Sequence, residues 1–182
     1  RGLEMCIRDS SFGLPPALMQ ALALLSIGLL LSGFAVASAR RVKGYVNGYT
    51  AQSVALTAIA IAVGWGTARW DLFIVAGLTL LVKVVLIPRL LWSVGRRLPE
   101  QRESVPLLDK ASSLVGALIL TLIAFFTAPA VVAPGTVLNE PPLAISLALV
   151  LIGLFVLSVR RHVLAQVVGL LTIENGLFAG AL

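Results

Sequence analysis

Six long apolar runs constrain this chain more than any other feature of its sequence. A helix needs about 20 apolar residues to cross the roughly 30 Å hydrocarbon core of a bilayer. Only helices satisfy every backbone hydrogen bond in runs of this length that lack a strand-like alternation. The sequence therefore predicts an all-α, polytopic membrane helix bundle with six transmembrane helices. The expected spans are about residues 14–39, 51–68, 72–94, 111–133, 143–159 and 163–182.

Composition narrows the function classes in the same direction. Apolar residues make up 59% of the chain and charged residues 12%, whereas an average soluble domain has about 25% charged residues. These values exclude a soluble enzyme. One Cys and one His exclude a disulfide scaffold and a four-ligand zinc or iron–sulfur site held by this chain alone. The sequence also has no nucleophile–base pair and no phosphate-binding loop, so we expect no catalytic activity from the chain alone and no cofactor within it.

The two ends of the sequence differ from the rest. Residues 1–10 (RGLEMCIRDS) are polar and without periodicity, and we expect them to be a non-native or disordered tail. Residues 11–182 are predicted to form a single transmembrane domain. The last apolar run reaches Leu182 without a charged or aromatic flank of the kind that ordinarily ends a membrane helix, so we expect a seventh helix to be missing from this sequence.

The basic residues predict the orientation in the membrane. Ten of them lie in or beside the loops that follow the first, third and fifth spans, and the loops on the other side hold only Arg69. By the positive-inside rule, the basic loops are cytoplasmic and the N-terminus is outside. The same distribution accounts for the net charge of +6 without a nucleic-acid partner. The ten residues are Arg40, Arg41, Lys43, Arg89, Arg96, Arg97, Arg102, Lys110, Arg160 and Arg161.

Two charged residues lie deep inside predicted spans. Lys83 is about 16 Å from either end of its helix, and Glu174 is similarly deep. A lone charge at that depth costs on the order of 3 kcal/mol on insertion scales. Such residues usually face a bundle interior and have a role there, and we expect these two to belong to a proton or ion path. Two alternatives remain: Lys83 extends its side chain toward the cytoplasmic face, or the two charges form a static pair that holds helices together.

Other polar and small residues near Lys83 and Glu174 indicate a functional role less strongly. His162 lies at the cytoplasmic mouth of the last span, where it either feeds protons inward or is an ordinary headgroup-region residue. Asn175, Gly176 and Gly180 are expected to serve helix packing, the glycines as a pair of small residues four apart. Pro88, five residues after Lys83, predicts a kink in the third span.

Three stretches carry a resemblance to a known family. They are Gly48–Leu56 (GYTAQSVAL), Leu80–Pro88 (LLVKVVLIP) and Arg161–Leu182 (RHVLAQVVGLLTIENGLFAGAL). With them the chain resembles component E of hydrogenase-4, a membrane subunit of formate hydrogenlyase-type complexes. The C-terminal part is also similar to the small three-helix subunit of complex I and of multi-subunit cation/proton antiporters. In those subunits an embedded Glu on the middle helix belongs to the proton path, and Glu174 matches it.

The resemblance implies a function that the residues alone do not give. It implies a non-catalytic membrane-arm subunit of a group 4 [NiFe]-hydrogenase or complex I-like oxidoreductase, contributing to proton translocation in a bacterial or archaeal plasma membrane. The nickel–iron centre and the iron–sulfur clusters would lie in partner subunits, and the direct partners would be other membrane subunits and the lipid bilayer. A small subunit of a cation/proton antiporter and a purely structural membrane subunit remain as alternatives.

Overall fold

The computed structural model describes residues 16–67, 70–97, 109–131 and 140–181. Within these ranges the chain is a helical bundle, and six helices are long and apolar enough to cross a membrane. The prediction of an all-α bundle with six spans is confirmed. The expectations for residues 1–10 and Leu182 lie outside the described residues. The helices are α2 (Pro16–Ser38), α3 (Val42–Thr67), α4 (Trp70–Thr79), η1 (Leu80–Leu86), α5 (Ile87–Arg97), α6 (Lys110–Val131), α7 (Glu140–Val159) and α8 (Val163–Ala181).

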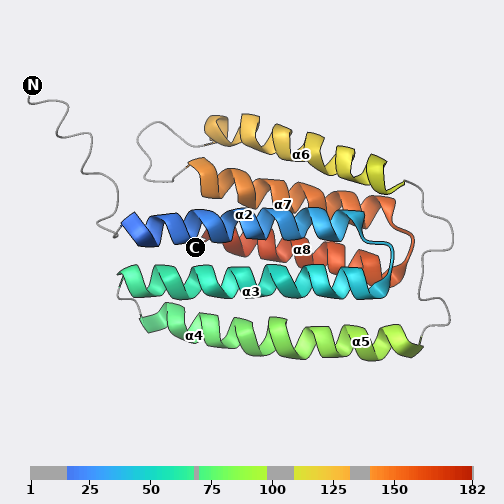
Figure 1. Cartoon of the computed structure of the whole chain (residues 1–182), viewed down its shortest axis with the longest axis horizontal. Coiled ribbons are helices and arrows are strands. Elements are labelled where there is room, and N and C mark those ends of the chain that lie inside the picture. The colour runs from blue at the N-terminus through green and yellow to red at the C-terminus, as the bar shows by residue number, and fades with distance from the viewer. Residues whose placement is uncertain (1–15, 68–69, 98–108, 132–139, 182) are drawn as a thin grey trace, which may run out of the picture.

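The third span is a single long helix built from three parts. Its α4 and α5 ends are α-helical, and η1 between them is a π-helix. All six spans run roughly along one axis (Figure 1). At the right-hand end of Figure 1, α2, α5 and α7 end and α3, α6 and α8 begin. We call this the basic end of the bundle, because most of the basic residues named above lie near it.

The second span begins earlier than its apolar run indicates. Its helix α3 starts at Val42 instead of residue 51. The added turns carry Tyr45 and Tyr49, both of which are buried. A hydropathy criterion detects helices whose surface faces lipid, whereas α3 packs against the third span on one side and against α2 and α8 on the other (Figure 1). Several of its polar side chains, among them Gln52, Ser53 and Thr57, are therefore buried against protein.

Close backbone contact fixes α8 against α7. A Cβ atom added to Gly153 of α7 would lie 2.8 Å from the carbonyl oxygen of Gly169 and 2.9 Å from the backbone nitrogen of Ile173, both on α8. A Cβ atom added to Gly169 would lie 3.0 Å from the carbonyl oxygen of Gly153. In a bilayer, helices associate through such close packing, because lipid supplies no hydrophobic driving force between them. The glycine contact therefore determines where the side chains of α8 are placed.

A buried arginine joins three helices at the basic end. Arg160, directly after α7, is only 2% exposed. Its Nη2 donates to the carbonyl oxygen of Ala37 (2.7 Å) and to Oγ of Ser113 (3.2 Å). A buried guanidinium requires such acceptors. Arg160 belongs to the predicted cytoplasmic segment, but its side chain points into the protein and ties α7 to α2 and α6.

The glycine contact predicts a stability effect. Gly153→Ala places a methyl group against the backbone of α8, and overpacking of this kind costs about 1–3 kcal/mol. Gly28→Ala is the matched control, because a Cβ at Gly28 meets nothing within 4 Å and alanine favours helix by up to about 1 kcal/mol. Thermal unfolding in detergent, followed by circular dichroism, should show a lower Tm for Gly153→Ala only. Equal Tm values for the two variants would contradict the close contact.

The buried arginine predicts a second effect. Arg160→Met leaves two buried acceptors without their charged donor, and each such hydrogen bond contributes about 1.5–3 kcal/mol. Arg161→Met removes the same charge from an exposed neighbour, where substitutions usually change stability by no more than about 0.5 kcal/mol. Unfolding in detergent should rank Arg160→Met clearly below Arg161→Met. The reverse order would show that Arg160 is not a structural link.

Candidate functional site

Lys83 lies at the centre of the π-helix η1. The N–H of Ile87 donates to the carbonyl oxygen of Val82, five residues earlier, as in a π-turn. Pro88 follows directly; it has no N–H, and in an α-helix its ring would collide with the carbonyl of Val84. The wider π-turn avoids this conflict and changes the direction in which Lys83 points. Such turns are frequently found at functional sites.

The Lys83 ammonium meets two neighbouring residues of α8. Its Nζ donates to Oδ1 of Asn175 (2.9 Å) and lies 3.0 Å from Oε1 of Glu174. The side chain extends past α3, which lies between the third span and α8. The structure therefore brings together the two membrane-embedded charges that the sequence singled out. Asn175, expected to serve helix packing, is part of the same cluster.

A buried amide on α3 extends this cluster. Nδ2 of Asn175 donates to Oε1 of Gln52 (3.3 Å), and both residues are fully buried. Glu174, Lys83, Asn175 and Gln52 thus form a continuous polar row across three helices. Sequence analysis did not single out Gln52; the available signal was a lone amide within an apolar run. We call these four residues the midmembrane cluster.

Further buried polar groups lie beside Gln52 on α3. Tyr49 and Ser53 are three residues before and one residue after it, and both are fully buried. The Tyr49 hydroxyl, the Ser53 hydroxyl and Nε2 of Gln52 make no hydrogen bond to the part of the chain that the structure describes. Native proteins pair almost all such groups with protein or water. This stretch of α3 therefore has hydrogen-bonding capacity beyond that used by the midmembrane cluster.

Glu174 lies at the border of the bundle and not in its interior. Its side chain is 57% exposed, while that of Lys83 is 10% exposed. The cause is helical geometry: α8 buries Asn175 and Gly176, and the preceding residue points about 100° away. One carboxylate oxygen faces Lys83, and the remainder of the group is open on the outer surface. The ring of Phe178 lies 5.5 Å from Nζ of Lys83, a cation–π distance that adds to the stabilisation of the ammonium.

The structure separates His162 from this cluster. His162 lies at the junction of α7 and α8, about 18 Å along the helix from Glu174, and is partly exposed.

Gly176 and Gly180 lie against α7, where Oγ of Ser146 donates to the carbonyl oxygen of Gly176 (2.7 Å). In the described residues, no group of three His, Cys, Asp or Glu side chains could hold a metal ion.

Comparison with known proteins places the chain among relatives. It is 36% identical to the uncharacterized protein Rv0085 of Mycobacterium tuberculosis over 157 residues. This alignment covers 85% of this chain and 70% of that protein. The chain belongs to the family of this mycobacterial protein. It is also 29% identical over 149 residues to hydrogenase-4 component E of Escherichia coli K12, covering 81% of this chain and 68% of that protein. The component E of Shigella flexneri matches to the same extent.

The six apolar helices and the similarity to a hydrogenase-4 component together show that the chain is a multi-pass membrane protein. The resemblance to hydrogenase-4 component E predicted from the sequence is present at the level of sequence identity. No family model matches the chain. No solved structure matches it either.

The π-turn predicts a measurable change in the cluster. Pro88→Ala allows a regular α-helix without the extra residue that the π-turn accommodates. Removing that extra residue rotates Lys83 by about 100° around the helix axis relative to α5. Lys83 and Asn175 should then lose their energetic coupling. A double-mutant cycle with Lys83→Met and Asn175→Leu, measured by unfolding in detergent, should give about 0.5–3 kcal/mol with Pro88 present and near zero in the Pro88→Ala background. The control background is Pro129→Ala, which removes a proline inside α6 and should preserve the coupling.

Proposed function

We propose that this chain is a membrane-arm subunit of a group 4 [NiFe]-hydrogenase or complex I-like assembly and contributes to proton translocation. The observation that carries the proposal is the direct contact of Lys83 with Glu174, 3.0 Å apart in the membrane interior. The similarity to hydrogenase-4 component E supports the kind of complex. The nickel–iron centre and the iron–sulfur clusters are placed in partner subunits, and none in this chain.

The pair supplies a physical way to couple proton uptake and release. The ammonium of Lys83 is held by a carboxylate and an amide oxygen in surroundings of low dielectric constant. When Glu174 takes up a proton, the ammonium loses its counter-charge, and an unpaired buried charge is strongly disfavoured. Lys83 then releases a proton. The proton then passes from Glu174 to the neutral Lys83 amine, which restores the carboxylate, the ammonium and the contact between them.

The two sides of the midmembrane cluster serve as entry and exit. The exposed side of Glu174 meets an adjoining membrane helix of the assembly, since a carboxylate facing lipid would be costly. On the other side, Gln52 leads to Tyr49 and then Tyr45, one and two turns closer to the basic end. That end is the cytoplasmic side in the orientation proposed here. His162 lies at the same end, near the cytoplasmic mouth.

The test replaces each charged side chain by a neutral side chain of similar size and shape. Glu174→Gln in the native, assembled complex should lower redox-driven proton pumping in inverted membrane vesicles at least tenfold. Lys83→Met should do the same. Asp71→Asn, an equivalent acid-to-amide change at the exposed start of α4, should pump as the unmodified complex does. Native gel electrophoresis checks that each variant still assembles.

Other outcomes separate the alternatives. Unchanged pumping in both Glu174→Gln and Lys83→Met would refute the proton role. Full activity of the double variant Lys83→Met/Glu174→Leu would indicate a structural subunit. Na⁺- or K⁺-dependent proton exchange, in a purified assembly without nickel, would indicate a cation/proton antiporter.

A further inference from the structure

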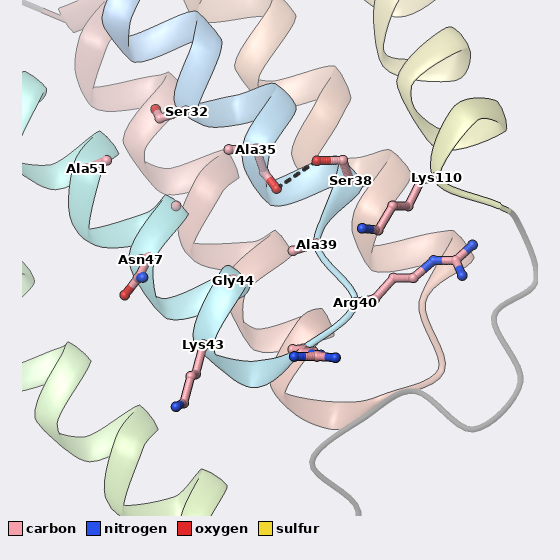
Figure 2. A pocket seen from close by; sticks show the side chains of 12 residues that line it. Ser32, Ala35, Ser38, Ala39, Arg40, Lys43, Gly44, Asn47, Ala51 and Lys110 are labelled. Atoms are coloured by element: carbon pink, nitrogen blue, oxygen red, sulfur yellow. Dashed lines mark hydrogen bonds between the residues drawn. The ribbon is translucent and has the colours of Figure 1, made fainter.

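A cleft opens between α2 and α3 at the basic end of the bundle, away from the midmembrane cluster. Its volume is about 850 Å³. The two walls are the last turns of α2 and the first turns of α3, and the start of α6 closes one side (Figure 2). The cleft has two regions of different chemistry: a groove of small residues and a mouth of basic residues.

The groove lies at the depth of the hydrocarbon. On α2 it is lined by Ser32 and Ala35, and on α3 by Gly48 and Ala51. Ser32 is about 9 Å from the end of α2, and Ala51 is about 13 Å from the start of α3. Ala35 and Ala51 are exposed. The small side chains leave room beside the two helices for an extended apolar chain that enters along the bilayer normal.

The mouth is strongly basic. Arg40, Arg41 and Lys110 line it, and Figure 2 shows Arg40 and Lys110 on the side of α6. Lys43 also borders the cleft, but its side chain projects from α3 away from it, and its Nζ lies 6.0 Å from the centre of the Trp92 ring. Asp109 binds Nη2 of Arg40 at 2.9 Å. The buried Nε of Arg40 has no hydrogen-bond partner among the described residues. Arg40, Arg41 and Lys110 thus face one carboxylate in the described part of the mouth, which leaves an excess of positive charge.

We propose that this cleft binds one anionic phospholipid. The headgroup phosphate lies among Arg40, Arg41 and Lys110, which bind phosphate through charge-assisted hydrogen bonds. One acyl chain lies in the groove of small residues. Basic pockets between membrane helices are known binding sites for anionic headgroups. A soluble anion would use the mouth alone, whereas a lipid uses both regions of the cleft. The bound lipid would connect α2, α3 and α6 at the membrane surface.

Native mass spectrometry of the purified complex in mild detergent tests this proposal. With added phosphatidylglycerol we expect one retained lipid, bound at least tenfold more tightly than phosphatidylcholine. Arg41→Gln/Lys110→Gln should weaken phosphatidylglycerol binding at least tenfold. The matched control, Arg89→Gln/Arg96→Gln, removes two exposed basic residues of α5 outside the cleft and should bind as before.

Two further arms distinguish the source of the phosphate and the role of the groove. Ala51→Phe fills the groove without changing charge, and it should weaken the lipid but not inorganic phosphate. Displacement of the lipid by millimolar inorganic phosphate would instead indicate a free-anion site and overturn the proposal. Equal affinity for the anionic and zwitterionic lipids, or an equal loss in the Arg89/Arg96 control, would overturn it as well. None of these outcomes depends on proton pumping.

Discussion

The ammonium of Lys83, held between Asn175 and Glu174, is the interaction on which the rest of the interior depends. A cation at this depth is tolerated only with partners in the right geometry. Three separate features provide that geometry. The π-helix directs Lys83 inward, the contact of Gly153 with the α8 backbone holds the partner residues in place, and the amide of Gln52 fixes Asn175 from the other side.

The role of α3 follows from the same requirement. A membrane helix that is rich in Tyr, Gln, Ser and Thr would be unstable against lipid, because each unpaired polar group costs free energy there. In this protein α3 lies between two other layers and buries those residues. It thereby allows polar side chains to line the interior from the basic end to the membrane centre. The most polar of the six spans thus buries most of its polar side chains against its neighbours.

Much of the architecture could be predicted from the sequence, because crossing a bilayer leaves few solutions. The number of spans and both embedded charges follow from apolar runs and their interruptions. The contact between Lys83 and Glu174 was one of several alternatives at the level of the sequence, because it depends on which helices are neighbours and on the π-turn. The early start of α3 was missed because hydropathy detects apolar residues, and the first turns of α3 instead bury Tyr45 and Tyr49 against protein. The outward position of Glu174 follows from which face of α8 the glycines bury.

Arg160 has a consequence for how the protein is made. Membrane helices are inserted before they pack against one another, and orientation is decided at that earlier stage by basic residues beside each span. At that time Arg160 and Arg161 together form the positive segment between α7 and α8. Only afterwards does Arg160 turn inward to Ala37 and Ser113. In the orientation proposed above, the same side chain is a topogenic signal during insertion and, in the packed bundle, a link from α7 to α2 and α6.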